Sequence, residues 1–382
     1  MPTRLSVTTL RLAQFRSYRF AEIETDGRSV ALHGPNGAGK TNLLEAVSLL
    51  VPGRGLRSAS SEDFARRPEG AGWRIRAALF GPDPGLEVVT GLEGEGSRQV
   101  EIDGKSTTQS RLGHHIRQVW LTPAMDRLWV EGASERRRFL DRMTLGFTPE
   151  HAETSIAYEK AMRARNRLLK EGQWHDAWLS GIEAQMARAG AKIAHARAMS
   201  LTRLLAAQSG AETLFPRADL AILGPMETRF SEALRAGEVL EILEEDEAAG
   251  FAERLGHARG QDAIAGRTLE GPHRSDLDAV YAAKAMPARA CSTGEQKALL
   301  LSLCLANARA LSTETDATPI LLMDEVAAHL DADRRRALYT EIAAIGAQAW
   351  MTGTGPELFE GLDGAMQVAV TEGVDGTRLD IA

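Results

Sequence analysis

The sequence predicts an α/β fold in which a mixed, mainly parallel sheet flanked by helices is interrupted by an inserted and mostly helical region. Three observations predict it. A Gly-rich loop lies between a short apolar strand and a helix at 30–47, an apolar strand ends in two acidic residues at 319–325, and a long helical pattern separates them. We expect residues 1–118 and 270–382 to form one α/β head, and residues 119–269 to form a helical arm.

Bulk composition is that of a globular protein. The chain has 382 residues, of which 43% are hydrophobic and 25% charged, which favours two domains or one domain with a large insertion. No apolar run approaches membrane-spanning length, and the first residues carry no signal-peptide core, so we expect a cytoplasmic protein without a membrane partner. Because the net charge is −7, binding to nucleic acid would need a local basic surface.

The remaining elements follow from local patterns. Strand-like runs are expected at 5–12, 73–80, 86–92, 98–102, 119–122, 277–281, 348–352, 367–370 and 377–381. Helices are expected after Ser134 as a cap, after Thr148-Pro149, over 173–208, from 292 to about 310, and over 334–345.

The stretch from Gly34 to Thr41 has the complete pattern G-x-x-x-x-G-K-T. Its glycines have no Cβ, so backbone N–H groups can approach phosphate oxygens, and the following helix directs its free N–H groups at the same anion. Lys40 supplies charge for the outer phosphates, and the Thr41 hydroxyl can ligate Mg²⁺. The residues expected to bind nucleotide here are Gly34, Pro35, Asn36, Gly37, Ala38, Gly39, Lys40, Thr41 and Asn42. A Gly-rich turn that matches by chance is the alternative.

Two carboxylates are placed to complete such a site. Asp324 closes a buried apolar strand, at the sheet edge where the Gly-rich loop also opens, and Glu325 follows it. A carboxylate at the first position can organise Mg²⁺, and one at the second can orient or activate an attacking water. The alternative is a strand that merely ends in solvent. The separation of 284 residues from Lys40 to Asp324 implies that the chain leaves the head and returns.

A second phosphate-binding helix end is expected at Ser292-Thr293-Gly294. One nucleotide cannot readily occupy two helix N-termini of the same head. The simplest solution is two heads facing each other, with each Ser292 end completing the other's site. A simple capped helix is the alternative.

Several strings together resemble an ABC-type ATPase head of the structural-maintenance-of-chromosomes (SMC) class, and within it the bacterial RecF family. They are GPNGAGKTNLLEA at 34–46, STGEQK at 292–297, ILLMDEVAAHLD at 320–331, LRLAQFRSY at 10–18, PGRGLR at 52–57, GASERRRFLDR at 132–142 and EGPHRSDL at 270–277. The short helical middle also fits, because other members of the class carry long coiled coils there.

The resemblance implies an ATP- and Mg²⁺-dependent protein that forms a homodimer through its heads, binds double-stranded and gapped DNA near the nucleoid, and acts with RecO- and RecR-type partners to load a recombinase. It implies slow ATP hydrolysis, with Lys40, Asp324 and Glu325 catalytic and Thr41 and Asp324 at the metal. Ser292 and Gly294 would reach the opposite nucleotide, Asp331 would lie at the dimer seam, and Arg16 would contact nucleotide.

Two features depart from the family pattern, and one expected glutamine has no secure position. RecF-type chains often carry a second Asp where Glu325 stands, so its role as a base rests on the broader ABC class. Met351-Thr352-Gly353-Thr354 stands where ABC transporters place a histidine. Gln118 is only a candidate for the glutamine expected between the two lobes.

The predicted arm carries a local basic surplus. Residues 134–170 contain nine Lys or Arg and five Asp or Glu, and Lys160, Arg163, Arg167 and Lys170 are spaced three, four and three. On a helix this spacing forms one stripe that can lie along DNA phosphates. A solvated helix face is the alternative.

Other functions stay open. These are another SMC-like chromosome or repair ATPase, a small-molecule P-loop kinase, an ABC transporter subunit, and a module that binds ATP without turnover. The kinase would not need Ser292-Thr293-Gly294, and the long separation between motifs argues against the transporter.

Overall fold

The computed structural model describes residues 2–68, 70, 72–83, 85–94, 96–172, 175–373 and 376–381, without the side chain of His329. The chain divides into two compact units, which we call the head (1–126, 211–216 and 297–382) and the arm (127–210 and 217–296). Residues 119–126 therefore lie in the head and 270–296 in the arm, unlike the expected limits. Strand pairing explains this, because β9 (Gln118–Leu121) pairs with β14 (Ile320–Met323), and β11 (Asp276–Tyr281) pairs with β10 (Ala218–Leu223).

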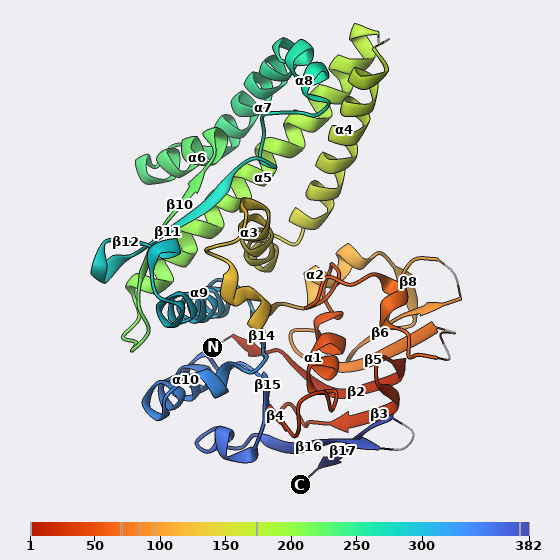
Figure 1. Cartoon of the computed structure of the whole chain (residues 1–382). Coiled ribbons are helices and arrows are strands. Elements are labelled where there is room, and N and C mark those ends of the chain that lie inside the picture. Colours follow the sequence, from red (N-terminus) through yellow and green to blue (C-terminus); the bar gives the residue numbers. More distant parts are fainter. Residues whose placement is uncertain are drawn as a thin grey trace. The chain divides into compact units, whose positions relative to one another are not determined.

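The head is built on a mainly parallel sheet with strand order β17-β16-β4-β15-β14-β9 (Figure 1). Besides β9 and β14, its strands are β4 (Val30–His33), β15 (Ala349–Gly353), β16 (Met366–Gly373) and the antiparallel edge strand β17 (Gly376–Ile381). The central strands are almost fully buried, which is why they appear as continuous apolar runs in the sequence. Because β4, β15 and β14 run parallel, the carboxyl ends of β4 and β14 lie at one edge of the sheet. The predicted α/β fold class is confirmed.

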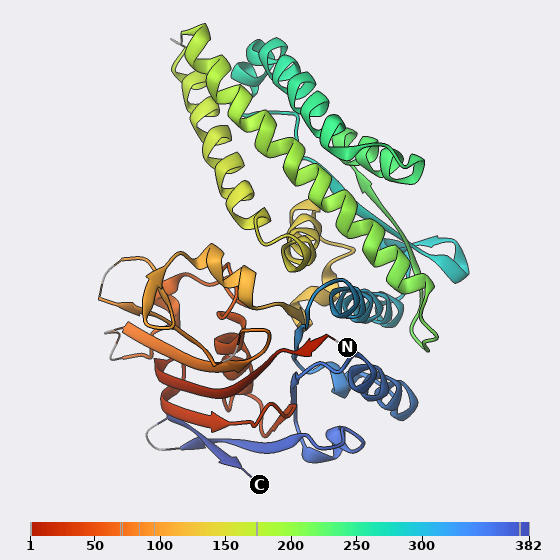
Figure 2. The same cartoon turned by 180° about the vertical axis from the view of Figure 1, so that it is seen from behind.

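A second, antiparallel sheet of the head has the order β3-β2-β5-β6-β7-β8, and its strands are drawn in red to orange in Figure 2. Its strands are β2 (Ser6–Phe15), β3 (Tyr18–Glu24), β5 (Gly72–Phe80), β6 (Leu86–Glu93), β7 (Gln99–Ile102) and β8 (Lys105–Thr107). Helix α1 (Lys40–Ser48) shares one core with both sheets: Leu43 and Val47 cluster with Leu10 of β2 and Trp350 of β15. Burial of this apolar side fixes the helix beneath the loop that precedes it.

The rest of the head consists of short strands and flanking helices. These are β1 (Thr3–Arg4), β13 (Ala317–Thr318), α2 (Leu112–His115), α9 (Thr293–Glu314) and α10 (Ala332–Ile345). The division between head and arm falls inside α9, after Gln296. An ion pair between Arg309 and Glu341 joins α9 to α10.

The arm is mostly helical. Its helices are α3 (Ala133–Phe147), α4 (His151–Glu171), α5 (Asp176–Ser209), α6 (Pro225–Ala236), α7 (Leu240–His257) and α8 (Arg259–Ala265), and β10 and β11 form an antiparallel sheet with β12 (Met286–Pro287). Tyr158, Met186, Phe230 and Phe251 form the centre of its core. The prediction that Ser134 caps α3 is wrong, because the capping position is Gly132 and Ser134 lies inside the first turn. Among the described residues, no helix has the length and apolar character that crossing a membrane requires.

Candidate nucleotide-binding site

The loop between β4 and α1 contains two glycines whose surroundings leave no room for a Cβ. A Cβ added to Gly34 (φ 144°) would lie 2.2 Å from the Val370 carbonyl oxygen of β16. One added to Gly39 (φ 110°) would lie 2.7 Å from Thr377 Oγ1 and 2.8 Å from Ser17 Oγ. At Gly37 (φ 84°) a Cβ would meet nothing within 4 Å, so this side of the loop is open. The glycines thus serve the close packing behind the loop and leave its front accessible.

Hydroxyl groups outside the predicted motif brace this loop from behind. Asn42 Nδ2 donates to Ser17 Oγ (2.9 Å), the Ser17 and Thr377 hydroxyls lie 2.8 Å apart, and Thr377 Oγ1 lies 2.9 Å from the Ala38 carbonyl oxygen. Tyr18 donates to the Gly39 carbonyl oxygen (3.0 Å), and burial raises the pKa of this phenol. These braces come from the turn between β2 and β3 (Ser17), from β3 (Tyr18) and from β17 (Thr377), and the phosphate-loop pattern does not predict them.

Lys40 is the buried cation of the loop. Its Nζ donates to the carbonyl oxygens of Gly34 (2.6 Å) and Pro35 (2.9 Å), at the loop's own entrance. Burial lowers the pKa of Lys40, whereas the carboxylates of Glu325 and Asp324 oppose that shift. The structure therefore places all three predicted catalytic residues close enough to influence one another.

Asp324 joins the loop to the neighbouring strands. Its Oδ1 accepts from Thr41 Oγ1 (2.9 Å) and from Thr352 Oγ1 of β15 (2.7 Å). Thr352 Oγ1 in turn accepts from the Glu325 backbone N–H (2.8 Å). A hydroxyl and a carboxylate oxygen side by side fit Mg²⁺, which takes one or two protein ligands and completes its shell with phosphate and water oxygens. The two residues predicted to hold the metal thus share one site. Thr352, from the segment 351–354 that lacks the histidine of ABC transporters, is a member to which the sequence assigned no role.

Arg16 forms a partly buried ion pair with Glu45 of α1. Its guanidinium makes two bonds to Glu45 (2.8 and 3.0 Å) and lies over the Phe64 ring. Arg57 reaches the same carboxylate (3.4 Å) and donates to Asn42 Oδ1 (2.8 Å). Since Glu45 is fully buried, losing these cations would leave a charge unpaired in the helix that carries Lys40 and Thr41. Whether Arg16 also contacts nucleotide stays a prediction.

Gln118 is not at this edge of the sheet. It is the first residue of β9 and pairs with Ile320, the first residue of β14, so it lies at the edge opposite to Asp324. Its Nε2 donates to the Val47 carbonyl oxygen near the end of α1 (2.8 Å). As a candidate for the glutamine between the lobes, Gln118 is therefore wrong, because it supports the far end of the helix.

Asp331 and the Ser292 segment both form helix caps. Asp331 Oδ1 accepts from the Arg334 N–H (2.8 Å) at the start of α10. In the arm, Ser292 and Glu295 form a reciprocal pair: the Ser292 N–H and hydroxyl each donate to Glu295 Oε2 (2.8 Å). The bonds from Lys284 and then Ser292 lower the pKa of Glu295 to about 2. A Cβ at Gly294 would meet nothing within 4 Å, so packing within this chain does not require a glycine there.

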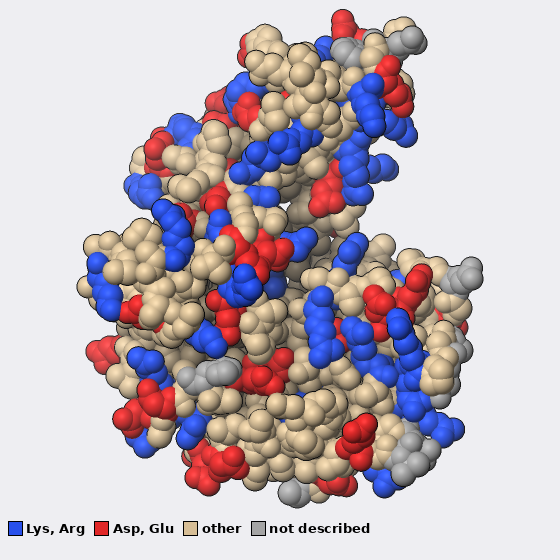
Figure 3. All heavy atoms as spheres, in the orientation of Figure 1, with Lys and Arg blue, Asp and Glu red and all other residues tan. Residues whose placement is uncertain are grey.

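The four cations of the predicted stripe are exposed along α4, and Figure 3 shows Lys and Arg gathered over this helix with acidic residues among them. Arg163 pairs with Glu159 (3.0 Å) and Arg167 lies 3.9 Å from Glu171. Lys160 and Lys170 make no ion pair with any residue that the structure describes. Lys160 and Lys170 are thus available to bind phosphates. Arg163 and Arg167 would give up weak surface ion pairs to do so.

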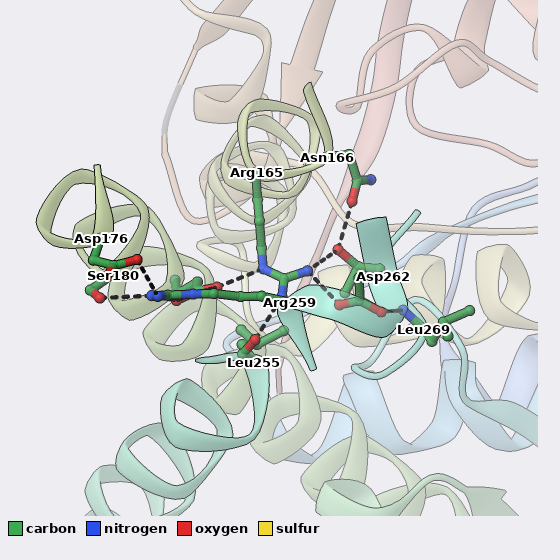
Figure 4. Close-up of polar contacts among 10 residues, drawn as sticks. Arg165, Asn166, Asp176, Ser180, Leu255, Arg259, Asp262 and Leu269 are labelled. Atoms are coloured by element: carbon green, nitrogen blue, oxygen red, sulfur yellow. Dashed lines mark hydrogen bonds and ion pairs between the residues drawn. The ribbon is translucent and has the colours of Figure 1, made fainter. Parts of the chain in front are cut away.

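The inner side of α4 carries Arg165, which is completely buried. It donates to Glu183 (3.0 Å), to Asp262 (2.6 Å) and to the Leu255 carbonyl oxygen (2.7 Å). These bonds join α4 to α5, α7 and α8, and Arg259 shares the Glu183 carboxylate. Figure 4 shows Arg165 between Arg259, Leu255 and Asp262. The network holds the basic helix onto the arm, and no pattern in the sequence predicted it.

Two strings of the family resemblance meet inside the arm. Arg136 makes two bonds to Asp276 (2.7 and 2.8 Å), and Arg137 donates to the Ser275 carbonyl oxygen (2.7 Å). Gly271 (φ 130°) is required because a Cβ there would lie 2.4 Å from the Tyr158 hydroxyl. These residues of 132–142 and 270–277 therefore have structural roles in the arm.

Comparisons with known proteins agree with this geometry. The family described as RecF/RecN/SMC N terminal domain matches residues 6–375. The DNA replication and repair protein RecF of Mesorhizobium japonicum (strain LMG 29417 / CECT 9101 / MAFF 303099) is 46% identical over 388 residues, with 100% of both chains covered. RecF of Caulobacter sp. (strain K31) is 48% identical over 390 residues, with 97% of both chains covered. A solved structure of the recombination mediator protein RecF with ATP has the same fold, with a TM-score of 0.83 at 24% identity over 100% of both chains. This chain therefore belongs to the RecF family of SMC-type ATPases.

Proposed function

We propose that this protein is an ATP-dependent DNA-binding protein of recombinational repair and replication-gap maintenance. The observation that carries the proposal is the bonded set of Thr41, Asp324, Thr352 and Glu325 at the mouth of the phosphate loop. A protein that only held ATP would need the loop and Thr41, but not a second acidic residue whose backbone N–H is tied through Thr352 to the first. The relatives' names supply the repair context.

The chemistry follows from the positions of these groups. Loop N–H groups and Lys40 bind the phosphates, and Thr41 and Asp324 hold Mg²⁺, which supplies charge neutralisation on the outer phosphates when bound. Glu325 orients a water and accepts its proton as the water attacks the terminal phosphorus, whose bond to the bridging oxygen breaks to leave ADP and phosphate. Turnover is slow and serves to reset DNA binding.

Nucleotide also joins two copies of the protein in this proposal. Ser292 and Gly294 of one copy face the phosphates in the other, and Asp331 lies at the seam. The open space at Gly294 supports this, since a phosphate can approach a backbone there. Only in the dimer can one ATP contact both copies of the protein. ATP therefore stabilises the dimer by mass action, and hydrolysis removes that stabilisation.

The stripe on α4 binds double-stranded or gapped DNA through phosphates, without reading sequence. RecO- and RecR-type proteins are the proposed partners in loading the recombinase, and the proposed location is the cytoplasm at the nucleoid. A solved relative's description places that protein in the RecFOR pathway, which supports these partners.

The test combines ATP hydrolysis with binding to gapped duplex DNA at several salt concentrations. Arg163→Glu with Arg167→Glu should lower DNA affinity at least about tenfold and reduce the salt slope by about two, because two phosphate contacts are lost. Arg188→Glu with Lys192→Glu, an exposed pair at the same spacing on α5, is the matched control and should have a much smaller effect. Equal losses in both pairs, or phosphate transfer to a small molecule without any effect of DNA, would contradict the proposal.

A further inference from the structure

We propose that Thr352 is a positioning residue that holds Glu325 in register with Asp324. The inference rests on the proposed function, because it concerns the group assigned there to the attacking water. Thr352 lies on β15, between the strand that carries Asp324 and the strand that leads into the phosphate loop. Its side chain is fully buried, so its hydroxyl bonds only with protein groups or a bound ligand.

The direction of the two hydrogen bonds is fixed by chemistry. A backbone N–H can only donate, so Thr352 Oγ1 accepts from Glu325. The single hydroxyl proton is then directed to Asp324 Oδ1, 2.7 Å away. The hydroxyl therefore connects a backbone donor on one acidic residue to the side chain of the other, and neither bond can be reversed.

Glu325 needs such support because its backbone is in the left-handed region, with φ 56°. This conformation is uncommon for a residue with a Cβ and persists only where surrounding contacts enforce it. The backbone conformation sets the direction in which the Glu325 side chain leaves the chain. A hydrogen bond to its N–H is therefore a means of aiming the carboxylate, and Asp324 provides the fixed end of that bond.

Residues 351–354 stand where ABC transporters place a histidine. In this chain the segment contributes the Thr352 hydroxyl to the site. Thr41 Oγ1 and Thr352 Oγ1 both donate to Asp324 Oδ1. If Thr41 turned to a bound metal, Thr352 would keep its donor on the carboxylate and so maintain the link to Glu325. Thr352 thereby couples the metal side of the site to the water side.

The experiment uses the full chain with Thr352→Val, which keeps shape and removes the hydroxyl, and Thr352→Ser, which keeps it. Thr90→Val is the matched control, since Thr90 is equally buried in a head strand, donates to Gln99 O (2.8 Å) and accepts from Arg98 Nε (2.8 Å). Single-turnover hydrolysis should fall about 10- to 100-fold in Thr352→Val, while ATP affinity stays within about threefold. Thr352→Ser and Thr90→Val should stay within about threefold of the wild type on both measures.

A double-mutant test separates positioning from general damage. In a Glu325→Gln background, Thr352→Val should cause no further loss, because it acts through Glu325. Full turnover by Thr352→Val while Glu325→Gln is inactive would overturn the proposal. So would an effect that disappears at saturating Mg²⁺, since that would assign Thr352 to Asp324 alone.

Hydrogen exchange at the Glu325 amide gives a readout that does not depend on turnover. Thr352→Val should lose protection there and Thr352→Ser should keep it. Unchanged protection in Thr352→Val would overturn the inference. A wild type that hydrolyses no ATP would instead refute the proposed function, and the exchange result would still decide whether Thr352 holds Glu325.

Discussion

Charged groups are held in two different ways in the head and in the arm. Around the phosphate loop, Lys40 and Asp324 are bonded mostly to neutral groups: backbone carbonyls for the cation and hydroxyls for the carboxylate. In the arm, Arg165 is bonded to two carboxylates that are themselves buried. Neutral partners can be exchanged for a ligand at small cost, whereas buried ion pairs cannot be opened without leaving a charge unpaired. The head site can therefore bind a charged ligand, whereas the arm network keeps its side chains in one arrangement.

The largest expected effect breaks the arm network. Arg165→Met should lower the free energy of unfolding of the arm by about 3–5 kcal/mol, because it leaves the buried Asp262 without a cation and Glu183 paired with Arg259 alone. Arg163→Met, two residues away on the exposed side of α4, should change it by less than about 0.5 kcal/mol. Urea unfolding with hydrogen exchange of α4 and α8 measures both. An Arg165→Met protein no less stable than Arg163→Met would show that the network does not hold the arm.

A smaller effect is expected at the head site, where the neutral partners of Asp324 can be exchanged for a ligand. Asp324→Asn should leave the fold intact but remove most of the Mg²⁺-dependent gain in ATP affinity, a loss of roughly tenfold, since an amide is a weaker ligand for Mg²⁺ than a carboxylate. Calorimetric titration with ATP in the presence of Mg²⁺ or of a chelator measures the gain. With the chelator, variant and wild type should agree, and a full Mg²⁺ effect in the variant would remove Asp324 from the metal site.

The smallest expected effect is a dependence of arm stability on pH. Burial lowers the pKa of His273, aided by the charge of Arg274, and the ring Nδ1 lies 2.7 Å from the Tyr158 hydroxyl. The neutral ring is therefore favoured in the folded arm, so its contribution is complete above the unfolded pKa of about 6.5 and is lost as the pH falls below it. Unfolding measured between pH 5 and 7.5 should show a steeper loss of stability for the wild type than for His273→Gln. Identical slopes would show that His273 does not titrate in this way.

The sequence predicted those parts of the fold and site that depend on neighbours in the chain. Gly34–Thr41 is a local pattern, since a loop that binds phosphate requires glycines at fixed spacing. Asp324 was found because an acidic residue at the end of an apolar run marks a sheet edge. The stripe on α4 followed from helical periodicity alone.

The parts that were missed depend on partners distant in sequence. Thr352 is an ordinary strand residue until β15 is placed beside β14, and Arg165 is indistinguishable from its exposed neighbours until Asp262, 97 residues away, is placed beside it. The errors at Ser134 and Gln118 have a similar origin. Ser134 is a suitable capping residue but lies inside the first turn of α3, and Gln118 lies at the end of its strand that is opposite to Asp324. Only the fold determines where such residues lie.

The most direct test of the account is sedimentation velocity of the Glu325→Gln protein with ATP and Mg²⁺, beside the wild type and Lys40→Ala. If ATP joins two heads and Glu325 is needed to release them, Glu325→Gln should form a stable dimer with ATP. Wild-type protein should return to its starting state as ATP is consumed, and Lys40→Ala should not dimerise. A Glu325→Gln protein that sediments identically with and without ATP would contradict the account.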